Sequence, residues 1–228
     1  MVRRLLTVSG AGPGSRVLSL GCGIGDTELL LAPHVGSVTG IDLSPSAIRQ
    51  ARADASAAGI RNAEFIEGAF EHLDGAFDFA FGVFFLHHLP DASLDAFPER
   101  IASLLAPGGV FYSLDPSRWR LAGALGRLIV PGLMRRYQTP DERELDPWTT
   151  AARFEAAGFA SRVAFYDFFS SQFAGLLPGF ESGYRMARAA DEVLCRIPLL
   201  SRLGGNFEVI ARLSAAPPEQ NCSTPRVS

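Results

Sequence analysis

The feature that most constrains the fold is a glycine-rich turn that follows a short apolar segment. The segment Arg16–Leu20 predicts a β-strand, and the next residues place glycine at positions 21, 23 and 25. Glycine lets a backbone turn sharply and approach a ligand closely, because it has no Cβ atom. We expect a helix directly afterwards, with Asp26 as its cap and its end near Ala32.

The alternation of strand and helix continues along the first half of the chain. Ser44 is expected to cap a helix in which Pro45 is the first residue. Short loops between alternating elements predict an α/β fold, a doubly wound and mostly parallel sheet with helices on both faces. Ligands of such sheets bind beyond the carboxyl ends of the strands. The predicted strands are residues 37–43, 63–67, 77–83 and 110–114, and the predicted helices are residues 45–58 and 91–105.

The second half departs from this pattern. We predict one domain over residues 1–214, with helical substrate-lid insertions near residues 117–146 and 170–205. Residues 215–228 are expected to be a disordered tail. The elements expected in this half are two short helices in 119–137, a helix at 147–157, a strand at 159–169, helical residues in 172–203 interrupted near Pro178 and Pro198, and a last strand at 206–213.

Composition excludes several classes of function. The net charge of -3 argues against a nucleic-acid partner. All 21 basic residues are arginine, so chemistry that needs a lysine, such as a Schiff base, is excluded. The three cysteines lie far apart and the four histidines show no metal-ligand spacing, so we expect neither disulfides nor a metal. We find no signal peptide and no apolar stretch of about 18 residues, and we expect a cytoplasmic protein.

The glycine turn predicts a ribonucleoside ligand without phosphate groups. A dinucleotide-binding turn reads G-x-G-x-x-G and would place glycine where this chain has Asp26. A carboxylate at that helix N-terminus would repel a pyrophosphate. Asp42 ends the second strand, where an acidic residue accepts hydrogen bonds from ribose hydroxyls. S-adenosylmethionine meets both requirements, and its sulfonium carries a positive charge.

Five segments in register resemble the class I S-adenosylmethionine-dependent methyltransferases, in particular those that act on small molecules. They read VLSLGCGIG, GIDLS, FIEGAFEHL, FDFAFGVFFLHHL and LAPGGVFYSLDP, and they span about residues 13–116. The segment NFEVIARL resembles the antiparallel last strand of that fold. The resemblance implies a seven-stranded sheet in the order 3-2-1-4-5-7-6.

The resemblance also implies which residues surround the cofactor, whose product is S-adenosylhomocysteine. The family commonly has an acidic residue at the position of Ser19, near the cofactor's amino group, and an aspartate at the position of Ala69, near the adenine. Two missing hydrogen bonds would weaken cofactor binding about tenfold or more, unless backbone groups replace them. The implied cofactor-binding residues are Ser19, Gly21, Cys22, Gly23, Gly25, Asp42, Leu43, Ala69, Phe70, Gly82 and Val83.

Methyl transfer requires alignment of the acceptor, and it needs a general base only when the acceptor is a weak nucleophile. His87 and His88 follow the fourth strand, and either could be that base because histidine titrates near neutral pH. The alternative is that one of them only bonds to the backbone. Asp115 ends the fifth strand and either binds a polar substrate group or caps the next helix. The residues that fall where the family has substrate walls are Tyr137, Tyr166 and Asp167.

Our main hypothesis is methyl transfer to oxygen, nitrogen or carbon of a small, fairly apolar acceptor, with secondary metabolism as the setting. A second hypothesis is a protein of the same fold that binds the cofactor without transfer, or that catalyses an isomerisation or cyclisation. Ser19 and Ala69 motivate it. A third is weak contact with a membrane surface and a lipid or prenyl acceptor, because residues 118–136 are basic and apolar.

Macromolecular acceptors fit less well. Gly82-Val83-Phe84-Phe85 stands where an N-P-P-Y-like tetrapeptide would indicate a nucleic-acid or protein acceptor. The chain is expected to be a monomer, or a homodimer that pairs through residues 182–200.

Overall fold

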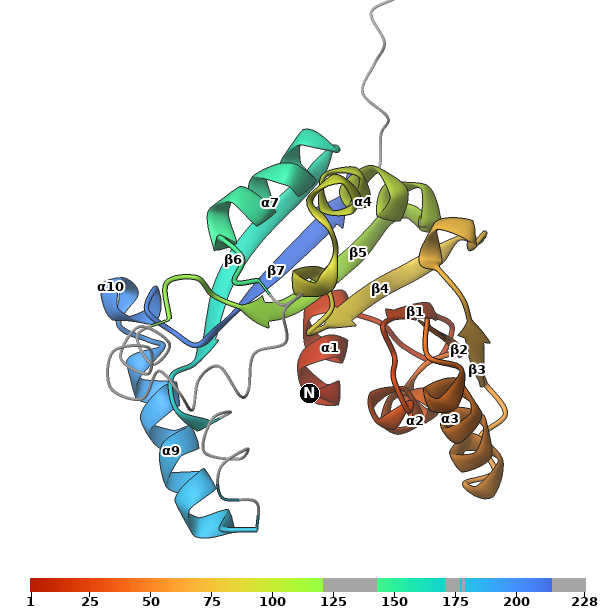
Figure 1. Ribbon diagram of the computed structural model, residues 1–228, viewed down its shortest axis with the longest axis horizontal. Coiled ribbons are helices and arrows are strands. Elements are labelled where there is room, and N and C mark those ends of the chain that lie inside the picture. Colours follow the sequence, from red (N-terminus) through yellow and green to blue (C-terminus); the bar gives the residue numbers. More distant parts are fainter. Residues whose placement is uncertain (121–142, 171–176, 178, 215–228) are drawn as a thin grey trace, which may run out of the picture.

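The structure is a computed structural model that describes residues 1–120, 143–170, 177 and 179–214 (Figure 1). Its centre is a seven-stranded sheet in the order β3-β2-β1-β4-β5-β7-β6. β7 is antiparallel to both of its neighbours, and the other four pairings are parallel. The predicted fold class and strand order are therefore confirmed.

Most strands match the sequence prediction closely, and the larger differences are in β5 and β6. Four of them, β1, β3, β4 and β7, have the predicted bounds. The seven strands are β1 (Arg16–Leu20), β2 (Ser37–Asp42), β3 (Ala63–Glu67), β4 (Phe77–Val83), β5 (Leu105–Pro116), β6 (Phe159–Asp167) and β7 (Asn206–Leu213).

Helices cover both faces of the sheet (Figure 1). On β5, Val110, Tyr112 and Leu114 pack in the cluster that contains Leu5 of α1, whereas Phe111 packs in the cluster of α4 and α7. The α-helices are α1 (Val2–Ser9), α2 (Asp26–Leu31), α3 (Pro45–Ala57), α4 (Asp91–Leu104), α7 (Pro147–Ala156), α9 (Glu181–Leu194) and α10 (Pro198–Ser201), and the short 3-10 helices are η1 (Ala32–His34), η2 (Phe70–His72) and η3 (Leu86–His88).

The start of α2 differs from the prediction. The N-cap is Gly25, with φ 84°, and Asp26 is the first helical residue, so Asp26 does not cap the helix. The left-handed backbone at the cap suits glycine, which then leaves no side chain there to accept a hydrogen bond. At α3 the prediction is confirmed, because the Ser44 hydroxyl accepts from the Ala47 amide.

Three strands have bounds that differ from the prediction. β2 ends at Asp42, one residue before its predicted end, and β5 ends at Pro116, two residues after its predicted end. β5 begins at Leu105 instead of Val110, because Leu105 already pairs with Phe77 before a register shift in the ladder. The Pro107-Gly108-Gly109 sequence, which usually ends an element, therefore lies inside a strand. β6 ends at Asp167, two residues before the predicted end.

Other expectations have mixed outcomes. The helix α1 was not predicted. The interruption of the helical segment near Pro198 was predicted, and α10 begins there. The two short helices expected within 119–137 and the tail lie largely outside the described residues. Within the described part of the chain, no helix combines the length and the hydropathy that a membrane crossing requires.

Candidate functional site

The glycine turn lies at the carboxyl end of β1, between β2 and β4, where the strand order of the sheet reverses. Gly21 has φ 65°, and a Cβ atom there would lie 2.8 Å from the Phe85 ring. A Cβ atom on Gly25 would lie 2.8 Å from the Phe65 ring. Glycine at these two positions lets the turn pack against aromatic side chains from the loops and strands beside it.

Asp42 joins the turn after β1 to the start of α3. Its Oδ2 accepts from the Gly23 amide at 2.8 Å, and its Oδ1 accepts from the Ser44 amide at 2.8 Å. The carboxylate is half-buried, and each oxygen has further acceptor capacity. Asp42 therefore fixes the turn and still has lone pairs for a ligand.

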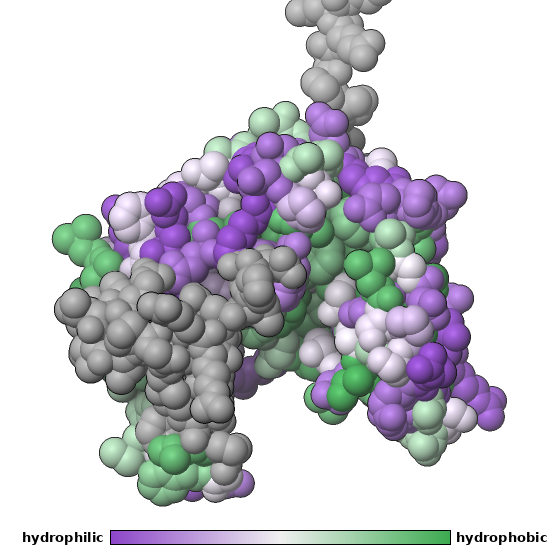
Figure 2. Space-filling view, in the orientation of Figure 1, coloured by the Kyte–Doolittle hydropathy of each residue, from purple (hydrophilic) through white to green (hydrophobic). Residues whose placement is uncertain are grey.

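A cavity of about 350 Å³ lies beside this carboxylate, and most of its walls are apolar. Figure 2 shows apolar surface in the hollow near the ends of β1 and β4, with hydrophilic surface around it. A larger depression of about 570 Å³, between α3 and β3, contains none of the predicted site residues. The predicted site residues that line the cavity beside Asp42 are Gly21, Asp42, Leu43, Ala69, Phe70 and His88.

A second cavity of about 160 Å³ lies beside the first, and Gly21 lines both. It lies between the end of β1, the end of β4 and α2, and its predicted lining residues are Ser19, Gly21, Cys22 and Val83. Gly82 does not line either cavity. A Cβ atom on it would lie 2.9 Å from the Cβ of Phe85, so Gly82 gives that side chain its place.

Glu28 is a site residue that sequence reasoning missed. It lines the smaller cavity from α2, is 2% exposed, and accepts a 2.5 Å hydrogen bond from the Ser19 hydroxyl. Burial raises the pKa of its carboxyl, and the charges of Asp26 and Asp42 raise it further, against the lowering effect of the Ser19 hydrogen bond. An acidic residue one turn into a helix gives no local signal. The absence of an acid at Ser19 was the only hint that another element might supply one.

The Cys22 thiol, which lines the same cavity as Glu28, also has a raised pKa. Burial raises the pKa of Cys22 to about 12, and the nearby Glu28 and Asp42 carboxyls contribute. The thiol is therefore protonated at neutral pH and unsuited to act as a nucleophile.

His87 and Asp115 form a buried pair. Nδ1 of His87 lies 3.0 Å from Oδ1 of Asp115, which also accepts from the His87 amide at 3.2 Å. Because a carboxylate only accepts, Nδ1 carries the hydrogen and Nε2 is free to accept a proton. The helix that Asp115 was alternatively expected to cap falls largely outside the described residues, so substrate binding and helix capping both stay predictions for Asp115. The other carboxylate oxygen, Oδ2, has no hydrogen-bond partner among the described residues.

His88 is exposed, and its ring centroid lies 3.9 Å from that of His87. Both histidines belong to η3, which follows a turn where Phe84 has φ 54°. This conformation is strained for a non-glycine residue, and strain of this kind occurs where surrounding contacts hold a functional segment in place.

The structure separates Tyr166 from this pair. Tyr166 packs in the cluster of Leu5 and Tyr112, on the α1 face of the sheet, and the Arg188 guanidinium lies 4.7 Å from its ring centroid. Along β5, Tyr112 and Asp115 point to opposite faces, so Tyr166 does not meet the His87 pair across the sheet. Asp167 is buried and bonds to Asn206. Tyr137 lies outside the described residues.

Comparison with known proteins gives consistent matches. A family model described as a methyltransferase domain matches residues 17–109. Over 154 residues the chain is 30% identical to the ubiquinone biosynthesis O-methyltransferase of Xanthomonas campestris, covering 63% of this chain and 64% of that one. Over 115 residues it is 37% identical to aklanonic acid methyltransferase DauC of a Streptomyces species, covering 48% of this chain and 51% of that one. The chain thus spans between half and two-thirds of the length of these relatives.

Solved structures agree on the fold. The [4+2]-cyclase SpnF superposes with a TM-score of 0.65 at 20% identity, covering 94% of this chain and 80% of that one. This likeness concerns the fold alone, since proteins of one fold perform different chemistry. The family model thus identifies a methyltransferase domain in residues 17–109, and the strand order agrees with the resemblance to class I S-adenosylmethionine-dependent methyltransferases.

Proposed function

We propose that this protein transfers a methyl group from S-adenosylmethionine to a small, fairly apolar acceptor. The observation that carries the proposal is the meeting of three features at one sheet edge. They are the glycine turn held by Asp42, the apolar cavity beside it, and the His87–Asp115 pair next to a cavity wall. The methyltransferase domain matched over residues 17–109 supports the reaction type, and two of the relatives are named for small-molecule substrates or pathways.

The residues at the turn suit an adenosyl group. The Asp42 carboxylate would accept from ribose hydroxyls, since both of its oxygens keep lone pairs. Leu43 and Phe70, with the Ala69 backbone, would enclose the adenine in the cavity of about 350 Å³ beside Asp42. The sulfonium of the bound cofactor would supply an activated methyl group, so the protein's main task is to align the acceptor.

His87 is the residue that we assign to proton removal from the acceptor. Asp115 holds its Nδ1–H, orients the ring and would stabilise the imidazolium once Nε2 has taken a proton. This pair favours a hydroxyl acceptor over an amine, because a hydroxyl is the weaker nucleophile at neutral pH. His88 is exposed at the wall of the cavity and would contact the acceptor there.

A second candidate function is a reaction without methyl transfer, such as a cyclisation. It is favoured by Ala69, which offers no side-chain acceptor for the adenine. The lipid or prenyl acceptor predicted from residues 118–136 depends on a segment that lies mostly outside the described residues.

Calorimetry with S-adenosylmethionine and S-adenosylhomocysteine tests the proposal first. We expect micromolar binding by the intact protein and a loss of at least tenfold in Asp42→Ala, because hydrogen bonds to a charged group are lost. The control is Asp74→Ala, which removes an exposed carboxylate elsewhere and should bind normally. Thermal melting of both variants separates ligand contacts from the role of Asp42 in holding the turn.

Turnover is then measured with methyl-labelled cofactor and a panel of phenolic and quinol acceptors. We expect His87→Asn to lower kcat by roughly 10²–10⁴ while S-adenosylhomocysteine binds as before. The matched control is His72→Asn, at an exposed histidine. Cofactor binding without turnover on any acceptor or cell extract would favour the second candidate, and no binding at all would refute the proposal.

A further inference from the structure

Glu28 has a polar atom that the described protein leaves unsatisfied. Its Oε1 accepts from Ser19, whereas Oε2 is buried and has no hydrogen-bond partner among the described residues. An unpaired buried carboxylate oxygen is strongly unfavourable, and its presence in a folded protein calls for an explanation. The explanation has to lie in something that contacts Glu28 and is not part of the described chain.

Among the described residues, no cationic side chain lines the cavity that contains Glu28. Its walls are small, apolar or polar neutral groups apart from two acids, Glu28 and the exposed Asp26. A volume of about 160 Å³ exceeds the share of several water molecules and accommodates a group of a few heavy atoms. The chemistry that fits is a small group that carries a positive charge and donates hydrogen bonds.

The position of this cavity narrows the choice of ligand. It shares the lining residue Gly21 with the 350 Å³ cavity, so the two cavities are adjacent, and an extended ligand that passes Gly21 would reach both. The larger cavity has the Asp42 carboxylate and apolar walls, which suit the adenosyl part, and the smaller cavity is then left for the other end of the molecule. In S-adenosylmethionine that end is an amino acid, and its ammonium is a compact cation with three donors.

We propose that Glu28 is the residue that binds the cofactor's ammonium group, and that Ser19 positions the Glu28 carboxylate by hydrogen bonding to it. The inference rests on the proposed function. Glu28 on α2 would supply the negative charge that is missing at Ser19 on β1. The two residues are nine positions apart in the sequence, and a buried hydrogen bond joins their side chains.

The first test compares two probes that differ only in the amino-acid part. S-adenosylhomocysteine carries the ammonium, and 5′-methylthioadenosine keeps the adenosine and thioether but lacks the amino acid. We expect Glu28→Gln to bind S-adenosylhomocysteine about 10–100-fold more weakly and 5′-methylthioadenosine as the intact protein does. Asp26→Asn removes an exposed carboxylate from the same cavity and should change both affinities less than threefold.

The second test moves the carboxylate. The double variant Ser19→Asp with Glu28→Ser exchanges acid and hydroxyl between β1 and α2, and it should recover the S-adenosylhomocysteine affinity to within about threefold. Retained affinity for 5′-methylthioadenosine shows that each variant keeps its fold, so misfolding cannot mimic the expected result.

The possible outcomes are distinct. Equal weakening of both probes in Glu28→Gln would overturn the assignment in favour of a general structural role. Unchanged S-adenosylhomocysteine affinity in Glu28→Gln would also overturn it, although the proposed function would stand. If the intact protein binds neither probe, the proposed function fails, and the assignment fails with it.

Discussion

Single side chains carry the chemistry of this site, and Glu28 is the one whose burial is hardest to reconcile with the free protein. Its neighbours Asp26, Asp42 and Cys22 offer no positive charge, and the first two raise its pKa. The carboxyl therefore destabilises the free protein whenever it is ionised. A cationic ligand would remove that penalty, so the same burial that is unfavourable without the ligand would favour its binding.

We expect Glu28→Gln to stabilise the free protein at neutral pH. Because the folded-state pKa of Glu28 is raised, the folded state holds its proton more tightly than the unfolded state. The stabilisation from the neutral form is present below the unfolded value, about 4.3, and is lost as pH rises through the higher folded value. At pH 7 the variant should gain about 1–3 kcal/mol, or roughly 2–10 °C in Tm.

Melting curves from pH 4.5 to 8 check this expectation. The advantage of the variant should shrink as the pH falls, because the intact protein becomes protonated at Glu28. Asp26→Asn, at an exposed carboxyl, serves as the control and should show little of this trend. A variant that melts below the intact protein at pH 7 would contradict the argument.

Prediction from sequence had a clear limit at this scale. The positions of Asp42, His87 and Asp115 followed from their places at or shortly after the carboxyl ends of strands, because these ends meet at one edge of a parallel sheet. Glu28 could not be found in this way. Its importance depends on Ser19, a residue of another element, and on the inward orientation of one helix face.

At the scale of elements, strands bounded by turn residues were the easiest to predict. β1 and β4 are short and mostly apolar, whereas β3 mixes apolar and acidic residues; polar or glycine-containing turns flank all three, and their bounds were correct. β5 was predicted too short because its first residues contain glycine and proline, whose local preference is overridden by pairing with β4. α1 was missed although its residues are amphipathic, because an eight-residue segment is too short to be stable as an isolated helix and tertiary packing decides its structure.

The cap of α7 gives a test at this scale. Asp146 accepts from the Trp148 and Thr149 amides at 3.1 and 3.0 Å, and from the Trp119 indole at 3.1 Å. Burial alone would raise the pKa of the Asp146 carboxyl, but these hydrogen bonds outweigh it and the pKa is lowered. We expect Asp146→Ala to destabilise the protein by about 1 kcal/mol, the usual value of a helix cap.

The control for this variant is Asp146→Asn, whose side-chain oxygen can still cap the helix, and it should lose about half as much stability or less. Because the folded pKa is lowered, the charged form contributes stability above the unfolded value of about 3.9, and this is lost as pH falls below it. Chemical denaturation at pH 7 and pH 3 should therefore show a smaller difference between the intact protein and Asp146→Ala at pH 3. Equal losses at both pH values would argue against the charge having this role.

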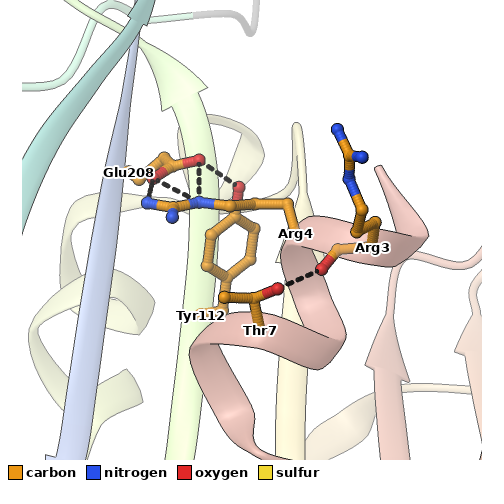
Figure 3. A network of polar contacts seen from close by, with 5 residues as sticks. All are labelled: Arg3, Arg4, Thr7, Tyr112 and Glu208. Carbon is orange, nitrogen blue, oxygen red and sulfur yellow. Dashed lines mark hydrogen bonds and ion pairs between the residues drawn. The ribbon is translucent and has the colours of Figure 1, made fainter.

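At the scale of the whole molecule, a polar network links the two ends of the described chain. Arg4 on α1 bonds to both carboxylate oxygens of Glu208 on β7, and the Tyr112 hydroxyl on β5 donates to the same carboxylate at 2.9 Å (Figure 3). Glu208 is 2% exposed. Because β7 lies beside β5 in the sheet, Glu208 reaches Arg4 of α1, although the two residues are 204 positions apart in the sequence.

This link shows why whole-molecule contacts were only partly predictable. The strand order followed from the family resemblance, and it implied that β5 and β7 are neighbours. Nothing near Arg4 or Glu208 indicates that they pair, because the contact depends on the helix α1, which the local sequence did not predict.

Removing Arg4 should destabilise the whole fold, because it leaves the Glu208 carboxylate buried with only the Tyr112 hydroxyl as a described side-chain donor. Breaking a buried ion pair from one side costs about 3–5 kcal/mol, and we expect about 2–3 kcal/mol here because Arg4 itself is partly exposed. The control is Arg3→Ala, one residue earlier, whose exposed side chain points away from the network in Figure 3. It should stay within about 0.5 kcal/mol of the intact protein.

A second substitution separates loss of the pair from loss of packing. Adding Glu208→Gln to Arg4→Ala removes the unpaired charge, and it should recover at least half of the lost stability in urea denaturation. Equal stability of Arg4→Ala and Arg3→Ala, or no recovery in the double variant, would mean that α1 is held by the packing of Leu5 and not by the ion pair. If the expected result is found, the Glu208 carboxylate holds α1 against β5, the strand that carries Asp115. The Arg4→Ala variant should then also have lower activity, although Arg4 does not contact the candidate site.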